Sequence, residues 1–147
     1  MAMRRTAVRS SPIHGRGVFA LGRIVAGEAL FEYKGTVLSW KEAQRRYERS
    51  AVEDGHTFFF DLGDGRVIDG ARGGNSARWV NHSCEPNCET EQDGSRVFFH
   101  ALRDIEPGEE LFIDYRLQVD GRKTVALKAL YQCRCAARGC RGTMLAS

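Results

Sequence analysis

Glycine spacing is the feature that most constrains the fold of this chain. Sixteen of its 147 residues are glycine, and they recur between short apolar segments rather than in one linker. Because glycine adopts turn conformations that other residues avoid, each recurrence ends a strand or helix after a few residues. The chain is therefore predicted to be mostly β, a β-rich α+β fold built from many short strands with few helices.

The apolar segments between the glycines predict individual strands. The Asp64-Gly65 and Asp93-Gly94 pairs are typical of hairpin turns, and Glu106-Pro107-Gly108 predicts a further turn. The expected strands cover residues 18–20, 29–34, 58–62, 66–68, 96–102 and 110–115.

Two segments favour helix. Residues 39–42, Ser-Trp-Lys-Glu, form a capping box that starts a helix through Arg49, with Trp40, Ala43 and Tyr47 as its apolar face. A short helix is expected over residues 125–130.

Composition suits one soluble globular domain, with 42% hydrophobic and 28% charged residues. The chain has no apolar run long enough for a membrane span, and its basic start lacks the apolar stretch of a secretory signal. We therefore expect a cytoplasmic or nuclear protein that needs no membrane partner.

Charge is distributed unevenly along the chain. Residues 1–50 hold ten Lys/Arg and four Asp/Glu, residues 51–120 hold six and fifteen, and residues 121–147 hold six and none. The acidic middle suits a basic protein or peptide partner, although plain solvated charge explains it equally well. The basic ends suggest nucleic acid as an alternative, but the Cys133–Cys140 segment lacks aromatic residues that stack on bases, so direct binding is not favoured.

The cysteines indicate a metal site. Their odd number and the absence of a signal argue against a disulfide framework, and three of them fall within the eight residues 133–140. A tetrahedral zinc ion needs a fourth ligand, for which spacing leaves His82, Cys84 and Cys88 open. Free thiols in a basic tail are the alternative. The five cysteines are Cys84, Cys88, Cys133, Cys135 and Cys140.

Three segments and the tail together resemble one family, the SET-domain protein lysine methyltransferases, with the trithorax-type branch closest. The segments are residues 11–19 (Ser-Pro-Ile-His-Gly-Arg-Gly-Val-Phe), residues 74–88, which contain Asn81-His82-Ser83-Cys84, and residues 108–115, which end in Asp114-Tyr115. The Cys-x-Cys-x4-Cys tail resembles the family's post-SET module. The resemblance extends from about Ala7 to Met144.

This resemblance implies a fold and a domain division. The fold consists of several small curved sheets around a knot-like crossing, in which the central and closing motifs build the active site together. A SET domain would span residues 5–118 and a post-SET zinc module residues 119–147. The resemblance also implies that zinc is held by Cys84, Cys133, Cys135 and Cys140, which leaves Cys88 outside.

The implied activity is methyl transfer from S-adenosylmethionine to lysine on a basic protein segment, with a histone-like tail as one candidate. A lysine amine must be neutral to react, and an apolar channel lowers its pKa. The resemblance assigns Tyr115 to orienting the amine and Tyr33 to lining the channel. Both positions also suit ordinary core tyrosines.

Cofactor binding is expected at the opening and central motifs. Gly15 and Gly17 permit close backbone approach, Arg16 can pair with a carboxylate, and the Asn81 side chain offers donors and acceptors. His82 is expected to act through its backbone, with a role as base or ligand as the alternative. The full set of expected cofactor contacts is His14, Gly15, Arg16, Gly17, Phe58, Asn81, His82 and Arg134.

One residue departs from the family pattern. Ile113 stands where many relatives carry Phe or Tyr, and an apolar side chain there is expected to allow more than one methyl group per lysine. A catalytically silent SET-like module that binds basic peptides is the alternative to an enzyme. Neither the substrate protein nor the oligomeric state follows from the sequence.

Overall fold

The structure is a computed structural model that describes residues 5–13, 15–49, 59–115 and 140–142, with the side chains of residues 46–49 left aside. Short strands dominate these residues, as the glycine spacing predicts. The elements in chain order are β1 (Thr6–Ser10), β2 (Arg16–Ala20), β3 (Ala29–Glu32), β4 (Thr36–Ser39), α1 (Trp40–Arg49), β5 (Phe59–Asp61), β6 (Arg66–Asp69), the 3-10 helix η2 (Ser76–Trp79), β7 (Asn81–His82), β8 (Cys88–Asp93), β9 (Arg96–Ala101) and β10 (Phe112–Ile113).

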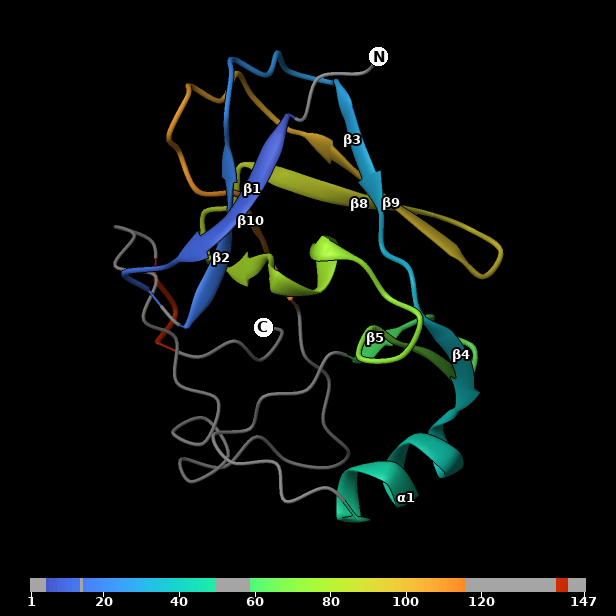
Figure 1. Cartoon of the computed structure of the whole chain (residues 1–147). Coiled ribbons are helices and arrows are strands. Elements are labelled where there is room, and N and C mark those ends of the chain that lie inside the picture. The colour runs from blue at the N-terminus through green and yellow to red at the C-terminus, as the bar shows by residue number, and fades with distance from the viewer. Residues whose placement is uncertain (1–4, 14, 50–58, 116–139, 143–147) are drawn as a thin grey trace.

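The strands form four small sheets rather than one large one (Figure 1). β1 pairs with β2, and the two three-stranded sheets have the orders β3-β9-β8 and β4-β6-β5. β7 and β10 form a separate parallel pair, whereas the other pairs are antiparallel. The predicted β-rich fold of several small sheets is therefore confirmed.

A single hydrophobic core joins these sheets. Ile24 and Ile105, both fully buried, face each other in an isolated antiparallel bridge. Phe99 of β9 is 1% exposed, and its ring centroid lies 5.3 Å from that of Phe31 and 6.1 Å from that of Tyr33. An aromatic cluster thus lies at the β3-β9 pair, and it includes Tyr33, one of the expected site residues.

The Ser39 cap of the predicted capping box is confirmed, but part of the expected apolar face of α1 is wrong. Ser39 Oγ accepts a hydrogen bond from the Glu42 N–H at 3.2 Å, and Ala43 is fully buried. Trp40 is 39% exposed because it is the first helical residue, where its N–H bonds the Gly65 carbonyl at the edge of the sheet. Within the described residues, no helix has the length and apolarity to cross a membrane.

Both predicted hairpins are present, as β5-β6 and β8-β9. Periodicity misses β1, β4 and β8, whose residues are mostly half-buried or exposed and show no clear alternation, and it misses the two-residue β7. The segment expected as a strand over residues 110–115 forms only the two-residue β10, since the Leu111 N–H bonds the Val18 carbonyl of β2 and the Tyr115 N–H bonds the His82 side chain. The expected helix over residues 125–130 and the boundary near residue 118 lie outside the described residues.

We predict that Phe99→Ala lowers the free energy of unfolding by about 3–5 kcal/mol, because it removes a buried ring from the aromatic cluster. Leu102, which is 45% exposed, is the matched control, and Leu102→Ala should stay within about 0.5 kcal/mol of wild type. Urea denaturation followed by circular dichroism measures both changes. Equal effects at the two positions would contradict this view of the core.

Candidate functional site

The parallel pairing of β7 with β10 brings the central and closing motifs together. Asn81 lies opposite Phe112 and His82 opposite Ile113, and the Ser83 N–H bonds the Ile113 carbonyl at 3.0 Å. A parallel pair cannot be closed by a tight turn, so these residues meet only because the intervening chain forms β8 and β9. The site is thus assembled from segments about 30 residues apart, as the register of the pair shows.

Asn87 locks this arrangement. Its Nδ2 donates to the Glu110 carbonyl at 2.8 Å, and its Oδ1 accepts from the Phe112 N–H at 2.8 Å. Asn87 is 2% exposed, so both of its amide groups are satisfied by the closing motif rather than by solvent. The sequence of residues 81–87 does not by itself assign this positioning role to Asn87, because both partners of its side chain lie in the closing motif.

Tyr115 follows β10 and faces the core. Its hydroxyl donates to the Val80 carbonyl at 2.5 Å, and burial raises the pKa of its phenol well above the usual range. Tyr33 is 7% exposed, and its ring centroid lies 5.4 Å from that of Phe60. Burial and then the charge of an ionised Tyr115 raise the Tyr33 pKa, so both phenols stay protonated.

His82 is buried and neutral. Its Nδ1 accepts the Tyr115 N–H at 3.0 Å, which places the ring proton on Nε2, 3.4 Å from Cys84 Sγ. Burial lowers the His82 pKa to about 4, against the opposing influence of Asp114. The side chain therefore connects the Tyr115 backbone with the Cys84 region, in addition to the backbone role expected for it.

Glu110 is a buried site residue that sequence reasoning missed. The residue is 8% exposed, and its carboxylate accepts hydrogen bonds from Ser11 Oγ at 2.8 Å and from Asn81 Nδ2 at 2.8 Å. A Cβ added at Gly17 would lie 2.3 Å from Glu110 Oε2, so glycine at this position makes room for the carboxylate. The one sequence signal that could have pointed to Glu110 is its position in the closing motif, residues 108–115.

The Asn81 amide is largely committed within the protein. Its Nδ2 donates to the Arg16 carbonyl at 2.9 Å as well as to Glu110. Both amide hydrogens are thus used to hold the opening motif against β7. The expected direct contact of Asn81 with a cofactor stays a prediction, and this side chain first shapes the backbone around Arg16.

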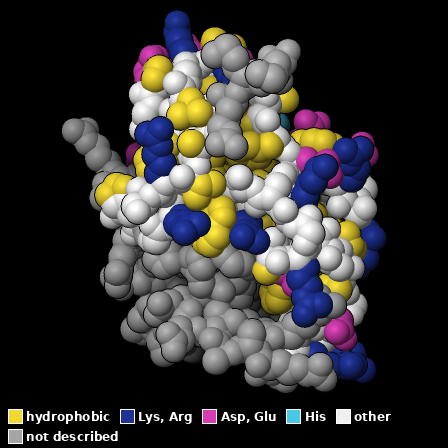
Figure 2. Space-filling model, in the orientation of Figure 1, with side chains coloured by type: hydrophobic (Ala, Val, Ile, Leu, Met, Phe, Trp, Pro, Cys, Tyr) yellow, Lys and Arg dark blue, Asp and Glu magenta, His cyan; other side chains and the backbone are white. Residues whose placement is uncertain are grey.

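Arg16 itself points to the surface next to an aromatic ring. Its guanidinium lies 5.5 Å from the Trp79 ring centroid, and that of Arg78 lies 4.9 Å from the same centroid. Figure 2 shows hydrophobic and basic side chains side by side on the face that carries β1 and η2. At Gly15, where φ is +46°, a Cβ would meet no described atom within 4 Å. An exposed cation beside an open backbone turn suits the carboxylate end of an amino-acid-like ligand.

The cysteines separate into two kinds. The Arg141 N–H, one residue after Cys140, bonds Cys84 Sγ at 3.3 Å, and the Gly142 N–H lies 3.4 Å from Cys140 Sγ. Cys88 is 1% exposed, and burial raises the pKa of its thiol to about 12. A protonated thiol inside the core is a poor metal ligand, whereas Cys84 lies beside the tail cysteine.

The structure thus brings most of the described candidates together. Asn81 and His82 lie in β7, where they bond Arg16 and Tyr115, and Gly17 lies against Glu110 beside β10. Tyr33 belongs to the core cluster against which Tyr115 packs, and Cys84 bonds the N–H of Arg141, the residue after Cys140. Gly15 is exposed in the turn before β2. The remaining candidates, His14, Phe58, Cys133, Arg134 and Cys135, lie outside the described residues.

Comparison with known proteins agrees with this architecture. The SET-domain family model matches residues 15–116. The chain belongs to the SET-domain family. Over 135 residues it is 38% identical to the histone-lysine N-methyltransferase ASHH1 of Arabidopsis thaliana, covering 87% of this chain and 26% of that protein. It is 35% identical to human histone-lysine N-methyltransferase 2B, covering 91% of this chain and 5% of the relative.

Solved structures lead to the same family. An active polycomb repressive complex 2 in the stimulated state matches with a TM-score of 0.69 and 33% identity, over 76% of this chain and 15% of that chain. The autoinhibited ctPRC2 bound to S-adenosylmethionine matches with a TM-score of 0.68 and 32% identity, with the same coverage. The chain spans about a quarter or less of the length of the relatives described above.

We predict that Asn81→Ala lowers the free energy of unfolding by about 1–3 kcal/mol, because it removes a donor from the buried Glu110 carboxylate. Gln92, whose amide also donates to a backbone carbonyl, is the control because it is exposed. Gln92→Ala should cost about 0.5 kcal/mol or less. Thermal and urea unfolding compare the two variants, and an equal cost would argue against a special role for the Glu110 contacts.

Proposed function

We propose that the chain is an S-adenosylmethionine-dependent protein lysine N-methyltransferase. The observation that carries the proposal is the placement of Tyr115, whose hydroxyl is fixed by the Val80 carbonyl where the two motifs meet, against the core cluster that contains Tyr33. Relatives named histone-lysine N-methyltransferases support this function. The structure of ctPRC2 bound to S-adenosylmethionine supports the choice of methyl donor.

The geometry of Tyr115 suits the orientation of an amine. Because the phenol O–H donates to Val80, the lone pairs of the oxygen are left to accept a hydrogen bond from a lysine N–H. Both phenols stay protonated near neutral pH, so they orient the amine rather than remove its proton. The apolar surroundings, which include Phe60 and Phe99, favour the neutral amine whose lone pair must attack.

The opening motif would hold the methyl donor. Arg16 and the open turn at Gly15 suit the carboxylate of the donor. The rest of the donor would lie along β2 and β7, which the Asn81 side chain joins. S-adenosylmethionine supplies an electrophilic methyl group on a sulfonium sulfur. The lone pair of a lysine amine oriented by Tyr115 would form the new N–C bond as the C–S bond of the donor breaks. The donor would leave as a thioether, and the methylated amine would release one proton to solvent. Alignment of these atoms contributes most of the rate.

A basic protein segment is the proposed substrate class, with a histone tail as the first candidate. The relatives act, by their names, on histone lysines, and one group of them is specific for lysine 4 of histone H3. The acidic excess over residues 51–120 is compatible with such a partner. A nuclear or chromatin location follows as part of the same proposal.

Ile113 faces inward at this site. It is 6% exposed, while its neighbour Phe112 is half-buried, so the strand register directs the isoleucine rather than the phenylalanine to the core. Its expected effect, permission of more than one methyl group, stays a prediction. Mass spectrometry of a lysine peptide under excess donor distinguishes the products.

We predict that Tyr115→Phe reduces methyl transfer to near background, because it removes the oxygen that orients the amine but keeps the ring. Turnover is measured with radiolabelled S-adenosylmethionine on a panel of histones. The circular dichroism spectrum and the calorimetric titration of the donor serve as controls, and both should match wild type. The lost hydrogen bond to Val80 should lower the free energy of unfolding by about 0.5–1.5 kcal/mol. Wild-type turnover in this variant would remove Tyr115 from the mechanism. An inactive wild type that still binds basic peptides would favour the silent binding module.

The tail would contribute a structural zinc ion. Cys84 Sγ accepts the N–H of Arg141, the residue directly after Cys140, and Cys140 Sγ accepts the Gly142 N–H. With Cys133 and Cys135 they make the four-thiolate set that tetrahedral zinc prefers. Bound zinc would fix the tail against the part of the central motif around Cys84. It would take no part in the methyl transfer.

We predict about one zinc ion per chain. Cys84→Ser should release it, whereas Cys88→Ser should retain it, because the Cys88 thiol is buried in β8 and donates to Asn87. Elemental analysis of both purified variants makes the comparison. Loss of zinc from the Cys88 variant alone would show that the ligand set is assigned incorrectly.

A further inference from the structure

Arg141 makes a forked ion pair with Asp114, the residue immediately before Tyr115. Arg141 Nη1 lies 2.7 Å from Asp114 Oδ2, and Nη2 lies 3.1 Å from Oδ1. The two side chains are only 26% and 16% exposed. Two parallel charge-assisted hydrogen bonds in a largely shielded position fix direction as well as distance.

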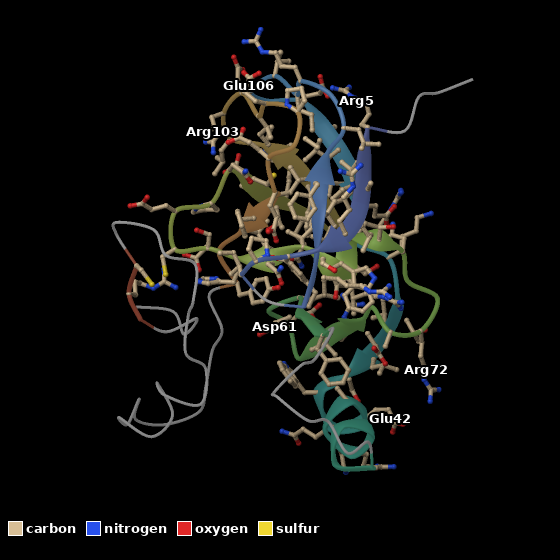
Figure 3. The ribbon with its side chains drawn as sticks, turned by 60° about the vertical axis from the view of Figure 1, so that its left-hand side comes forward. Arg5, Glu42, Asp61, Arg72, Arg103 and Glu106 are labelled. Atoms are coloured by element: carbon tan, nitrogen blue, oxygen red, sulfur yellow. The ribbon has the colours of Figure 1, made fainter. Side chains whose placement is uncertain are left out.

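The backbone of the same residue bonds the central motif. The Arg141 N–H donates to Cys84 Sγ at 3.3 Å, while its side chain holds Asp114, 27 residues earlier in the chain. One tail residue thus joins both motifs of the site. Figure 3 shows the described tail segment, in red, at the margin of the described sheets.

The ion pair leads directly to the proposed catalytic tyrosine. Asp114 Oδ1 lies 3.6 Å from His82 Nδ1, and the same nitrogen accepts the Tyr115 N–H at 3.0 Å. A displaced Asp114 would therefore disturb the backbone from which the Tyr115 hydroxyl is aimed. The hydroxyl itself is held to Val80 at the other end of the ring.

We propose that Arg141 is a positioning residue for methyl transfer, which fixes Asp114 and Tyr115 in their working geometry when the tail is docked. The inference rests on the proposed function of Tyr115. A lysine in place of Arg141 would keep the charge but could not make both parallel bonds. Docking of the tail would then be coupled to the alignment of the reacting amine.

The test compares Arg141→Gln, Asp114→Asn, their combination and Arg141→Lys. At saturating peptide and S-adenosylmethionine, each of the first two variants should lower kcat by about 10- to 100-fold, because small displacements at a reacting centre are costly. The combined variant should be no worse than the poorer single variant, since the pair acts as one unit. Arg141→Lys should be intermediate.

Arg103→Gln is the matched control. Arg103 also makes a forked pair, with Glu109 at 3.3 Å, but its side chain is 55% exposed and it lies near Glu106, at the end of the molecule opposite Glu42 (Figure 3). The kcat of the Arg103→Gln variant should equal that of wild type. Elemental analysis should show that all variants keep the zinc content of wild type.

Hydrogen exchange gives a reading that needs no turnover. The Tyr115 N–H and the Ser83 N–H are bonded to His82 and Ile113, so both should exchange faster in Arg141→Gln and Asp114→Asn than in Arg103→Gln. The measurement is made on the full chain without peptide. It therefore stands even if the wild type transfers no methyl group, a result that would reject the proposed function but not this coupling.

Three outcomes would overturn the inference. Wild-type kcat with wild-type exchange in Arg141→Gln is the first. A raised KM for the methyl donor with unchanged kcat and exchange is the second, because it would reduce Arg141 to a tail anchor. If Arg141→Gln fails to fold or loses zinc, Asp114→Asn decides, since it leaves every cysteine and the Arg141 N–H in place. Wild-type kcat and exchange in that variant is the third.

Discussion

The parallel pairing of β7 with β10 is the constraint on which the rest of this structure depends. It comprises only two residue pairs, yet it joins the central and closing motifs, and the bond from the Tyr115 hydroxyl to Val80 lies within a few residues of it. So short a ladder cannot hold itself together. Asn87, Glu110 and the core beneath them supply the missing support, because their hydrogen bonds tie each strand to a third segment.

Burial controls the chemistry at this pair. Removal from water keeps the two phenols protonated and the His82 ring neutral, so the side chains around the site present directed lone pairs and O–H or N–H bonds rather than free charge. The ionic groups are held differently. Asp114 is matched by a guanidinium, and the Glu110 carboxylate by the neutral donors of Ser11 and Asn81. A site of this kind suits a reaction that requires alignment more than proton removal.

The sequence predicts the short strands, the two hairpins, the Ser39 cap and most of the residues that meet at the site. These features carry local signals, namely Asp-Gly turns, a capping box and motifs with fixed spacing. Trp40 was assigned wrongly because periodicity does not show how far a helix extends over its sheet. Sequence reasoning does not find Glu110 and Arg141, since their partners are remote in sequence. Only tertiary structure brings Glu110 to the donors Ser11 and Asn81, and Arg141 to the Asp114 carboxylate.

Trp79 has a consequence for any anion that binds near the opening motif. A free arginine side chain samples many rotamers, and ordering it costs about 2 kcal/mol of side-chain entropy. The indole ring already holds the Arg16 guanidinium at its face, with Arg78 at the same ring. Much of that entropic cost is therefore met before a ligand arrives, and binding energy that would go into immobilising the arginine is left to increase affinity.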